Sequence, residues 1–338
     1  MTQLERLQKT GIQRLGTPKS GFRYESANGG SVSRADLARI KALRIPPAWT
    51  NVAINRSAKG MLQAVGTDAA GRSQYLYHEN HVRKREQKKF GRLLAFAQAL
   101  PKMRRVVARD LRRPELDRER VMACILRILS TCFMRPGSEV YASENGSYGI
   151  ATLRPRHVKV KGDVVEFDFR GKSGVRQQRE LKDRSVAKVV RGLLQQRAPE
   201  VFKYRNHEGK FVDIKRHQIN VYIKEVMGDR FSAKDFRTWA GTLICACALA
   251  RASRDLEDSR KGKKKKIVEA VKETADMLGN TPAVCRSAYI CPLVLDSFEE
   301  GKVIDQYFET VEDLVGHRGV HLHQAERALL RLLKRRSR

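Results

Sequence analysis

The sequence is poor in acidic residues and lacks long apolar runs. Its 338 residues include 37 Asp and Glu against 68 Lys and Arg, a formal net charge of +31. An excess of this size opposes compaction by self-repulsion and indicates a polyanionic partner. No apolar run is long enough to span a bilayer, and no lipidation signal or long basic amphipathic anchor is present. Nucleic acid is therefore favoured over an anionic membrane, and we expect no membrane association.

The signatures of several enzyme classes are also missing. The absence of P-loop, GxGxxG, HExxH and GxSxG motifs argues against nucleotide hydrolysis, dinucleotide binding and zinc proteolysis. No acidic cluster suits a pair of magnesium ions, which disfavours a two-metal nuclease. The six cysteines form no CxxC pair and no His/Cys grouping, so we expect buried reduced thiols rather than disulfides or zinc. The sequence thus predicts neither a cofactor nor a metal site.

The composition and length are those of a globular protein with room for two domains. Hydrophobic residues make up 41% of the chain. Its first residues, MTQLERLQKTGIQRLG, lack the apolar core of a signal peptide, so we expect a cytoplasmic, nucleoid-associated protein. Short strands at 51–54 and 62–65, separated by turns, indicate a β-rich N-terminal domain over residues 1–88. Residues 89–338 are expected to form a second, mainly helical domain.

Residues 81–113 hold twelve Lys and Arg and only two acids. A charge run of this kind is usually a solvated helix face. Because few counter-charges stand at helical spacing, we favour contact with nucleic-acid phosphates and place the link between the domains here. The run RKGKKKK at 260–266 looks too polar to pack and is expected to be a linker. A helix should follow it, with one face formed by apolar residues Ile267, Val268, Val271, Ala275 and Leu278.

The second domain should also contain a three-stranded antiparallel sheet. A helical period over 121–132 stops near Arg135-Pro136-Gly137. Alternating segments then follow at 158–160, 165–169 and 175–181, separated by glycine-containing turns. Further along, Gly279 reads as a helix C-cap, and Thr281-Pro282 should open a short helix running through Tyr289. The fold class is therefore α+β.

Six short motifs occur in an order that resembles the type IB DNA topoisomerases, in particular their compact poxvirus and bacterial branch. Each motif alone is weak, but six in the family's order make a specific signal over residues 20–320. The motifs are RIPPAW at 44–49, GRSQYLYH at 71–78, RPGSE at 135–139, FRGKSG at 169–174, KDFRTWAGT at 234–242 and GNTPAVCRSAYICP at 279–292.

The resemblance implies a catalytic role for five residues. Arg135 and Arg237 match the arginines that grip the scissile phosphate, Lys172 matches the lysine that protonates the leaving 5′-oxygen, and Tyr289 matches the nucleophile. Most family members have histidine where this chain has Asn280. Asparagine can donate a neutral hydrogen bond to a phosphate oxygen but cannot transfer a proton near neutrality, so a hydrogen-bonding role is favoured.

Four further residues are candidates for DNA contact. By resemblance, the segment with Gln74, Tyr75 and Tyr77 meets the major groove, where glutamine can pair with adenine and tyrosine can touch thymine methyls or phosphates. The alternative is that the two tyrosines, which share a strand face, only pack a small sheet. Lys234 is expected to contact a phosphate from the helix turn that carries Arg237.

The resemblance predicts an enzyme that relaxes duplex DNA through a transient 3′-phosphotyrosyl bond, without ATP or a required metal. We expect a monomer whose two domains clamp double-stranded DNA. Two alternatives remain. A tyrosine recombinase shares the Arg–Lys–Arg–Tyr chemistry but usually has a helical domain where this chain has RIPPAW and predicted strands. An architectural DNA-binding protein would need the charge but not the catalytic residues.

Overall fold

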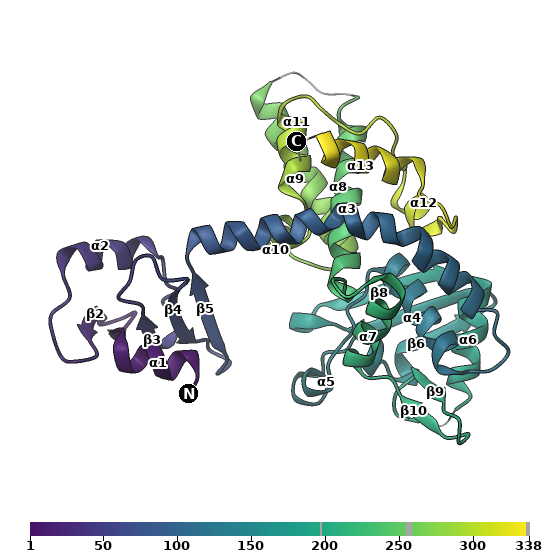
Figure 1. Cartoon of the computed structure of the whole chain (residues 1–338), viewed down its shortest axis with the longest axis horizontal. Helices are drawn as coiled ribbons and strands as arrows, with labels where there is room; N and C mark the ends of the chain where they lie inside the picture. Colours follow the sequence, from purple (N-terminus) through teal and green to yellow (C-terminus); the bar gives the residue numbers. More distant parts are fainter. Residues whose placement is uncertain (197, 255–258, 336–338) are drawn as a thin grey trace. The chain divides into compact units, whose positions relative to one another are not determined.

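A computed structural model describes residues 1–196, 198–254 and 259–335. The chain divides into two compact units, Met1–Phe90 and Gly91–Arg338 (Figure 1). Helix α3, Glu79–Asp110, begins in the first unit and ends in the second. None of the helices in the described ranges is both long and apolar enough to cross a membrane. The mixture of helices and sheets confirms the α+β class.

The N-terminal unit contains a five-stranded antiparallel sheet in the order β2-β1-β3-β4-β5. Buried Ile12, Val52 and Ile54 form its main core together with Ile40 from a helix. Two helices accompany the strands, although only strands were predicted here. The elements are α1 (Gln3–Thr10), β1 (Ile12–Thr17), β2 (Gly21–Ser26), α2 (Arg34–Ala42), β3 (Thr50–Ile54), β4 (Leu62–Thr67) and β5 (Ser73–Tyr77).

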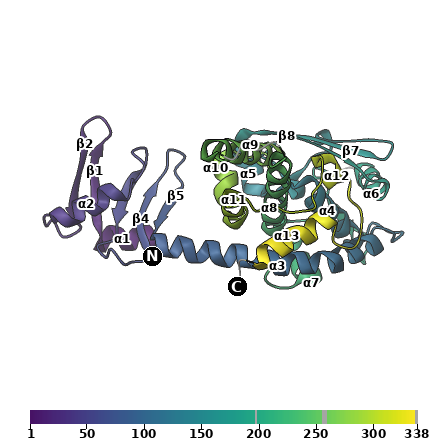
Figure 2. The same ribbon diagram turned by 90° about the horizontal axis from the view of Figure 1, so that it is seen from above.

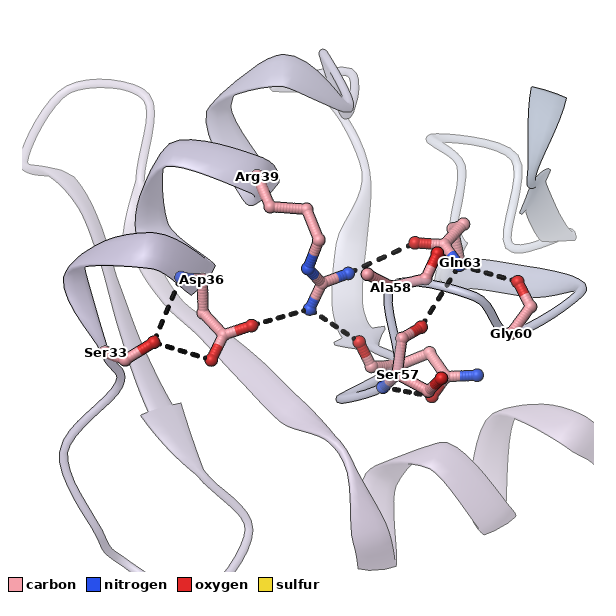
Figure 3. A network of polar contacts seen from close by, with 8 residues as sticks. Ser33, Asp36, Arg39, Ser57, Ala58, Gly60 and Gln63 are labelled. Carbon is pink, nitrogen blue, oxygen red and sulfur yellow. Dashed lines mark hydrogen bonds and ion pairs between the residues drawn. The ribbon is translucent and has the colours of Figure 1, made fainter.

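A polar network fastens α2 to the segment between β3 and β4 (Figure 3). The Arg39 guanidinium donates to Asp36, to the Asn55 carbonyl at 2.8 Å and to the Gln63 side chain at 3.1 Å. The Gln63 amide in turn donates to three carbonyls of the loop, the shortest at 2.6 Å to Gly60. Since each hydrogen bond contributes about 1 kcal/mol, this network helps a small sheet domain with a limited core to hold its loop.

The second unit is built around helix α4, Arg118–Cys132, whose residues 121–126 are fully buried. Its three-stranded antiparallel sheet has the order β6-β7-β8, as predicted, and α6 packs against β6 and β7 (Figure 1). The elements of this part are α5 (Glu139–Asn145), η1 (Ile150–Thr152), η2 (Pro155–His157), β6 (Val158–Lys161), β7 (Val164–Arg170), η3 (Lys172–Gly174), β8 (Arg176–Lys182), α6 (Arg184–Leu194), β9 (Lys203–Arg205), β10 (Phe211–Asp213) and α7 (Arg216–Met227).

Helix α8, Ala233–Ala252, is the centre of the remaining bundle, and α9, α11 and α13 all pack against it. Short α10 lies against α9, as Figures 1 and 2 both show. The elements are α9 (Arg260–Leu278), α10 (Pro282–Ala288), α11 (Pro292–Glu299), α12 (Val311–Gly316) and α13 (Gln324–Arg335). All six cysteines are buried, which confirms that prediction.

Two predictions around α9 are wrong. Residues 260–266 are not a linker but the first turns of α9, whose N-cap Ser259 accepts a hydrogen bond from the Gly262 N–H. Lysine has a good helix propensity, and its long side chain can extend into solvent, so a polar run can still be helical. Val268 is 62% exposed and does not belong to the apolar face, whereas Ile267 and Val271 are buried.

Candidate active site

The buried guanidinium of Arg237 connects three segments of the second unit. Arg237 lies in the second turn of α8 and is 3% exposed. It donates hydrogen bonds to the carbonyl oxygens of Phe133 and Leu278 (the latter at 2.8 Å) and to the Asn280 side chain at 2.5 Å. The end of α4, the end of α9 and the start of α8 are thereby joined at one side chain.

Arg135 is positioned by a close backbone contact between glycines. Its carbonyl accepts from the Ile150 N–H at 3.0 Å. A Cβ atom at Gly149 would lie 2.6 Å from the Arg135 carbonyl oxygen and 2.5 Å from the Gly137 nitrogen, so only glycine fits there. Gly137 has a φ of +87°, which also favours glycine. The RPG motif therefore fixes the loop that carries Arg135.

Asn280 joins the two arginines. Its Oδ1 accepts from Arg135 Nη2 at 2.9 Å and from Arg237 Nη2 at 2.5 Å. Because both partners are donors only, the atom that faces them must be the amide oxygen. Gly279, at φ +61°, ends α9 in the left-handed conformation and turns Asn280 toward the arginines. The sequence predicted this C-cap correctly.

Tyr289 lies directly beside this cluster as the C-cap of α10. The Arg237 guanidinium carbon is 4.8 Å from the centre of its ring. The Tyr289 carbonyl accepts a hydrogen bond from Thr242 Oγ1 at 3.1 Å, and a Cβ at Gly241 would lie 2.9 Å from the same oxygen. Thr281 and Pro282 start α10 as N-cap and first residue, as predicted, although the helix ends at Ala288.

The electrostatics of the cluster favour the ionised form of the phenol. Burial alone would raise the pKa of Tyr289, but the charge and hydrogen bond of Arg237, together with the charges of Arg135 and Lys234, outweigh it and the pKa is lowered. Burial, with repulsion from Arg135 next, lowers the pKa of Arg237 to about 10. Arg237 therefore stays protonated at neutral pH. A phenol beside two guanidinium groups and an amide is suited to attack an anionic centre.

The two candidate lysines differ in their relation to this cluster. Lys234 is exposed in the first turn of α8, close enough to lower the pKa of Tyr289. Lys172 is exposed in a short turn between β7 and β8, where Ser173 and Gly174 both have positive φ values. Within the described residues, no hydrogen bond or ion pair joins Lys172 to the other four candidates. The structure therefore brings four of the five predicted catalytic residues together.

The candidate DNA contacts in the N-terminal unit lie on edge strand β5. The rings of Tyr75 and Tyr77 are stacked with centroids 6.4 Å apart, which confirms their shared face. Gln74 alternates to the other face and donates to Asp68 Oδ2 at 2.9 Å. Arg85 lies over the Tyr77 ring at 5.6 Å, so this tyrosine adjoins the exposed basic start of α3.

Two residues that the sequence did not single out contact the end of α9, next to Asn280. Gln177 and Arg179 on β8 contact the end of α9: Arg179 donates to the Met277 carbonyl at 2.9 Å, and a Cβ at Gly279 would lie 2.4 Å from Gln177 Oε1. Arg179 also donates to Gln177 Oε1 at 3.1 Å. No local pattern marks these residues, because their partners stand about a hundred positions away.

Two protein-family models match the chain. Residues 78–300 match the catalytic core of eukaryotic DNA topoisomerase I, and residues 21–68 match the N-terminal domain of bacterial DNA topoisomerase IB. The DNA topoisomerase 1B of Acanthamoeba polyphaga mimivirus is 36% identical over 294 residues, which cover 86% of this chain and 88% of the relative. The enzyme of the same name from Vaccinia virus is 23% identical over 279 residues, 81% and 85% of the two chains.

These matches define an enzyme of the isomerase class. The chain belongs to the type IB DNA topoisomerase family. Its N-terminal match sets it beside the bacterial members of that family.

Proposed function

We propose that the protein relaxes supercoiled duplex DNA by breaking and rejoining one strand through a 3′-phosphotyrosyl bond at Tyr289. The observation that carries this proposal is the convergence of Arg135, Arg237 and Asn280 beside a phenol whose pKa is lowered. Attack by the phenolic oxygen on a backbone phosphorus forms the tyrosyl ester and releases a 5′-oxygen. The duplex then rotates about the intact strand, and the 5′-hydroxyl attacks the ester to restore the original bond.

The donors left over after the internal hydrogen bonds suit a phosphate. A guanidinium has five N–H groups; Arg237 donates to Phe133, Leu278 and Asn280 and also has a hydrogen bond with the Tyr289 side chain. Its buried Nε has no hydrogen-bond partner among the described residues. Since Asn280 offers its oxygen to the arginines, both N–H groups of its amide remain for a phosphate oxygen. These donors would stabilise the charge that grows on the non-bridging oxygens during attack.

Lys172 is the proposed general acid. The departing 5′-alkoxide is a poor leaving group and needs a proton as the bond breaks. The turn that carries Lys172 has two consecutive residues with positive φ and is exposed, so it can change conformation when DNA binds. The proton passes from the lysine ammonium to the 5′-oxygen during cleavage and returns during religation. The energy of the broken bond is kept in the tyrosyl ester, so this cycle uses no ATP and requires no metal.

Double-stranded DNA is the proposed substrate of both units. The net charge of +31 supplies attraction for the backbone, and Lys234 lies where it would meet a phosphate near Tyr289. In the N-terminal unit we assign Tyr75 and Tyr77 to the duplex, with Gln74 reading a base edge once it leaves Asp68. A monomer that encloses DNA between its units, working on the chromosome in the cytoplasm, fits these assignments.

A plasmid assay tests the proposal. The protein is incubated with supercoiled plasmid in EDTA without ATP, and topoisomers are resolved by electrophoresis. We expect stepwise relaxation, and protein–DNA adducts after denaturant is added. Tyr289→Phe should lose both while keeping near wild-type DNA binding, because binding comes from many phosphate contacts. Site-dependent strand exchange would instead identify a recombinase, and adducts that persist in Tyr289→Phe would mean that another residue attacks.

A further inference from the structure

The second unit contains a cavity of about 60 Å³ between α3, α4, α8 and the segment before α13. Its lining includes three arginines, Arg104, Arg127 and Arg318, together with His317 and apolar side chains. A water molecule needs about 10–15 Å³ of cavity volume, so the cavity has space for roughly four groups of that size. It is distinct from the proposed catalytic cluster, none of whose five residues lines it.

Arg127 is the least well neutralised of the three arginines. Its side chain is only 14% exposed, and its nearest carboxylate contact is with Asp183 Oδ2 at 3.7 Å, which Arg318 shares at 3.4 Å. Its guanidinium donates no hydrogen bond to any residue in the described ranges. Burial, and repulsion from Arg318 and Arg104, lower the pKa of Arg127 in spite of Asp183. The guanidinium is largely enclosed and its charge is balanced only by a carboxylate that Arg318 shares, so its N–H groups are available for an anion.

The other two arginines are already committed to the protein. Arg104 holds Glu326 through two hydrogen bonds of 2.7 and 2.9 Å and donates to the His321 carbonyl. Arg318 donates to backbone carbonyls, including that of Lys182 at 3.1 Å. Arg104 and Arg318 therefore contribute positive charge to the cavity rather than free hydrogen-bond donors. Three guanidinium groups against the carboxylates of Asp183 and Glu326 leave the site with one excess positive charge.

One ring nitrogen of a second cavity side chain, that of His317, also lacks a partner in the described part of the chain, although the side chain has a hydrogen bond with the His321 backbone. The Nε2 atom of His317 is buried and has no hydrogen-bond partner among the described residues. In the tautomer or protonation state that carries hydrogen at Nε2, it is a donor. Ser130 and Thr131 line the same cavity from α4, but their hydroxyls already donate to the Arg127 carbonyl, at 2.9 and 2.7 Å. An acceptor with several oxygen atoms would therefore satisfy unpaired donors on more than one element at once.

We propose that this cavity is a binding site for a small tetrahedral oxyanion, with the Arg127 guanidinium as its main ligand. Inorganic phosphate has the right number of oxygens for the space and the charge to match the excess cation. The site lies directly behind the catalytic cluster, because Phe133 and Phe236 line it and the Phe133 carbonyl accepts a hydrogen bond from Arg237. The oxyanion thus stabilises the packing on which the position of Arg237 depends.

Thermal unfolding of the whole protein tests the proposal with phosphate as the probe. The midpoint Tm is measured in increasing phosphate at an ionic strength kept constant with sodium chloride. We expect a saturable rise of roughly 3–5 °C when phosphate reaches about ten times its dissociation constant. Arg127→Gln should abolish this rise. Arg216→Gln, which removes one exposed charge at the start of α7, is the matched control and should keep it.

The catalytic cluster also attracts phosphate, so the test includes Arg135→Ala. The proposal requires that this variant keeps the phosphate-dependent rise in Tm. Loss of the rise in Arg135→Ala, or an equal rise in Arg127→Gln, would overturn it. If Arg127→Gln does not fold, crystals of the wild-type protein soaked in selenate decide the matter through anomalous diffraction. A selenium peak within hydrogen-bond distance of Arg127 supports the site, and peaks only elsewhere reject it.

Discussion

Arg237 and Lys172 are both proposed to act on the same phosphodiester, yet the fold holds them in opposite ways. Arg237 is 3% exposed and makes hydrogen bonds to protein acceptors, whereas Lys172 is an exposed side chain in a turn with two positive φ angles. Groups that stabilise developing charge work best when they are already in place. A general acid that is needed only after DNA is bound can lie in a turn that changes conformation on binding.

Substitution of Arg237, which the fold holds in place, should have the largest effects. Arg237→Ala should slow single-turnover cleavage by on the order of a thousandfold, because at least one transition-state donor is lost. It should also lower the free energy of unfolding by about 2–3 kcal/mol, since the carbonyls of Phe133 and Leu278 lose their donor. Urea titration measures the second effect.

Lys172→Ala is the matched comparison. It should slow cleavage strongly while leaving the urea midpoint unchanged, because no hydrogen bond in the described structure depends on this side chain. A large loss of stability in Lys172→Ala, or none in Arg237→Ala, would contradict the proposed difference between the two residues.

Substitutions of Asn280 distinguish two roles of its amide, which accepts hydrogen bonds from the arginines and can donate to a phosphate oxygen. Asn280→Ala should slow cleavage by on the order of ten- to a thousandfold. Asn280→His should retain much of the activity, since most of the family has histidine here. Asn280→Asp keeps an acceptor for both arginines but has no donor and repels phosphate, so it should be at least as slow as Asn280→Ala. Wild-type cleavage by Asn280→Ala would mean that the residue only shapes the turn after α9.

Thr242 should have a smaller effect, through the position of Tyr289. Its hydroxyl accepts from the Cys291 N–H at 3.1 Å and shares its one hydrogen between the carbonyls of Thr238, at 2.8 Å, and Tyr289, at 3.1 Å. Thr242→Val has nearly the same shape without these hydrogen bonds, and we expect cleavage to slow by about tenfold, since small displacements of a nucleophile are costly. Thr242→Ser should restore the rate. Equal rates for the valine and serine variants would exclude this positioning role.

The smallest expected change is a shift in the pH profile of cleavage. In the proposed reaction the phenolate attacks, so the rate should rise as the pH approaches the pKa of Tyr289. The arginines lower that pKa, which moves the rise to lower pH. Arg135→Ala removes one of these charges, so its rise should occur at higher pH than in the wild type. Lys234→Ala should shift it less. An unchanged profile in Arg135→Ala would show that Arg135 does not act on the phenol.

Much of the fold follows from local sequence. The β6–β7–β8 meander, the end of α4 and the caps around α10 depend on alternation, helical period and glycine or proline signals close in the chain. Helix α1 also has a local signal in the sequence, because Thr2 and Glu5 form a capping box. At residues 260–266 the high charge predicts a linker, but lysine favours helices and the segment forms the start of α9.

The candidate site was predictable only in part. The resemblance indicated which residue types belong together, but it did not show that Asn280 accepts from both arginines. The end of α9, just before Asn280, is contacted by Gln177 and Arg179 from a strand about a hundred positions earlier. Contacts between residues so far apart produce no periodic pattern in a single sequence. The same holds for Gly241, whose lack of a side chain allows α8 to approach Tyr289.

The division of work between the fixed arginines and Lys172 is tested most directly by placing sulfur at the 5′-bridging position of the cleavage site. A thiolate, whose conjugate acid has a pKa of about 8.5, leaves without the proton that an alkoxide needs. The non-bridging oxygens that the arginines would bind are unchanged. Sulfur should therefore restore cleavage by Lys172→Ala far more than by Arg135→Ala or Arg237→Ala. Equal restoration of all three variants, or none for Lys172→Ala, would contradict the account and assign the proton to another group, with Lys234 the next candidate.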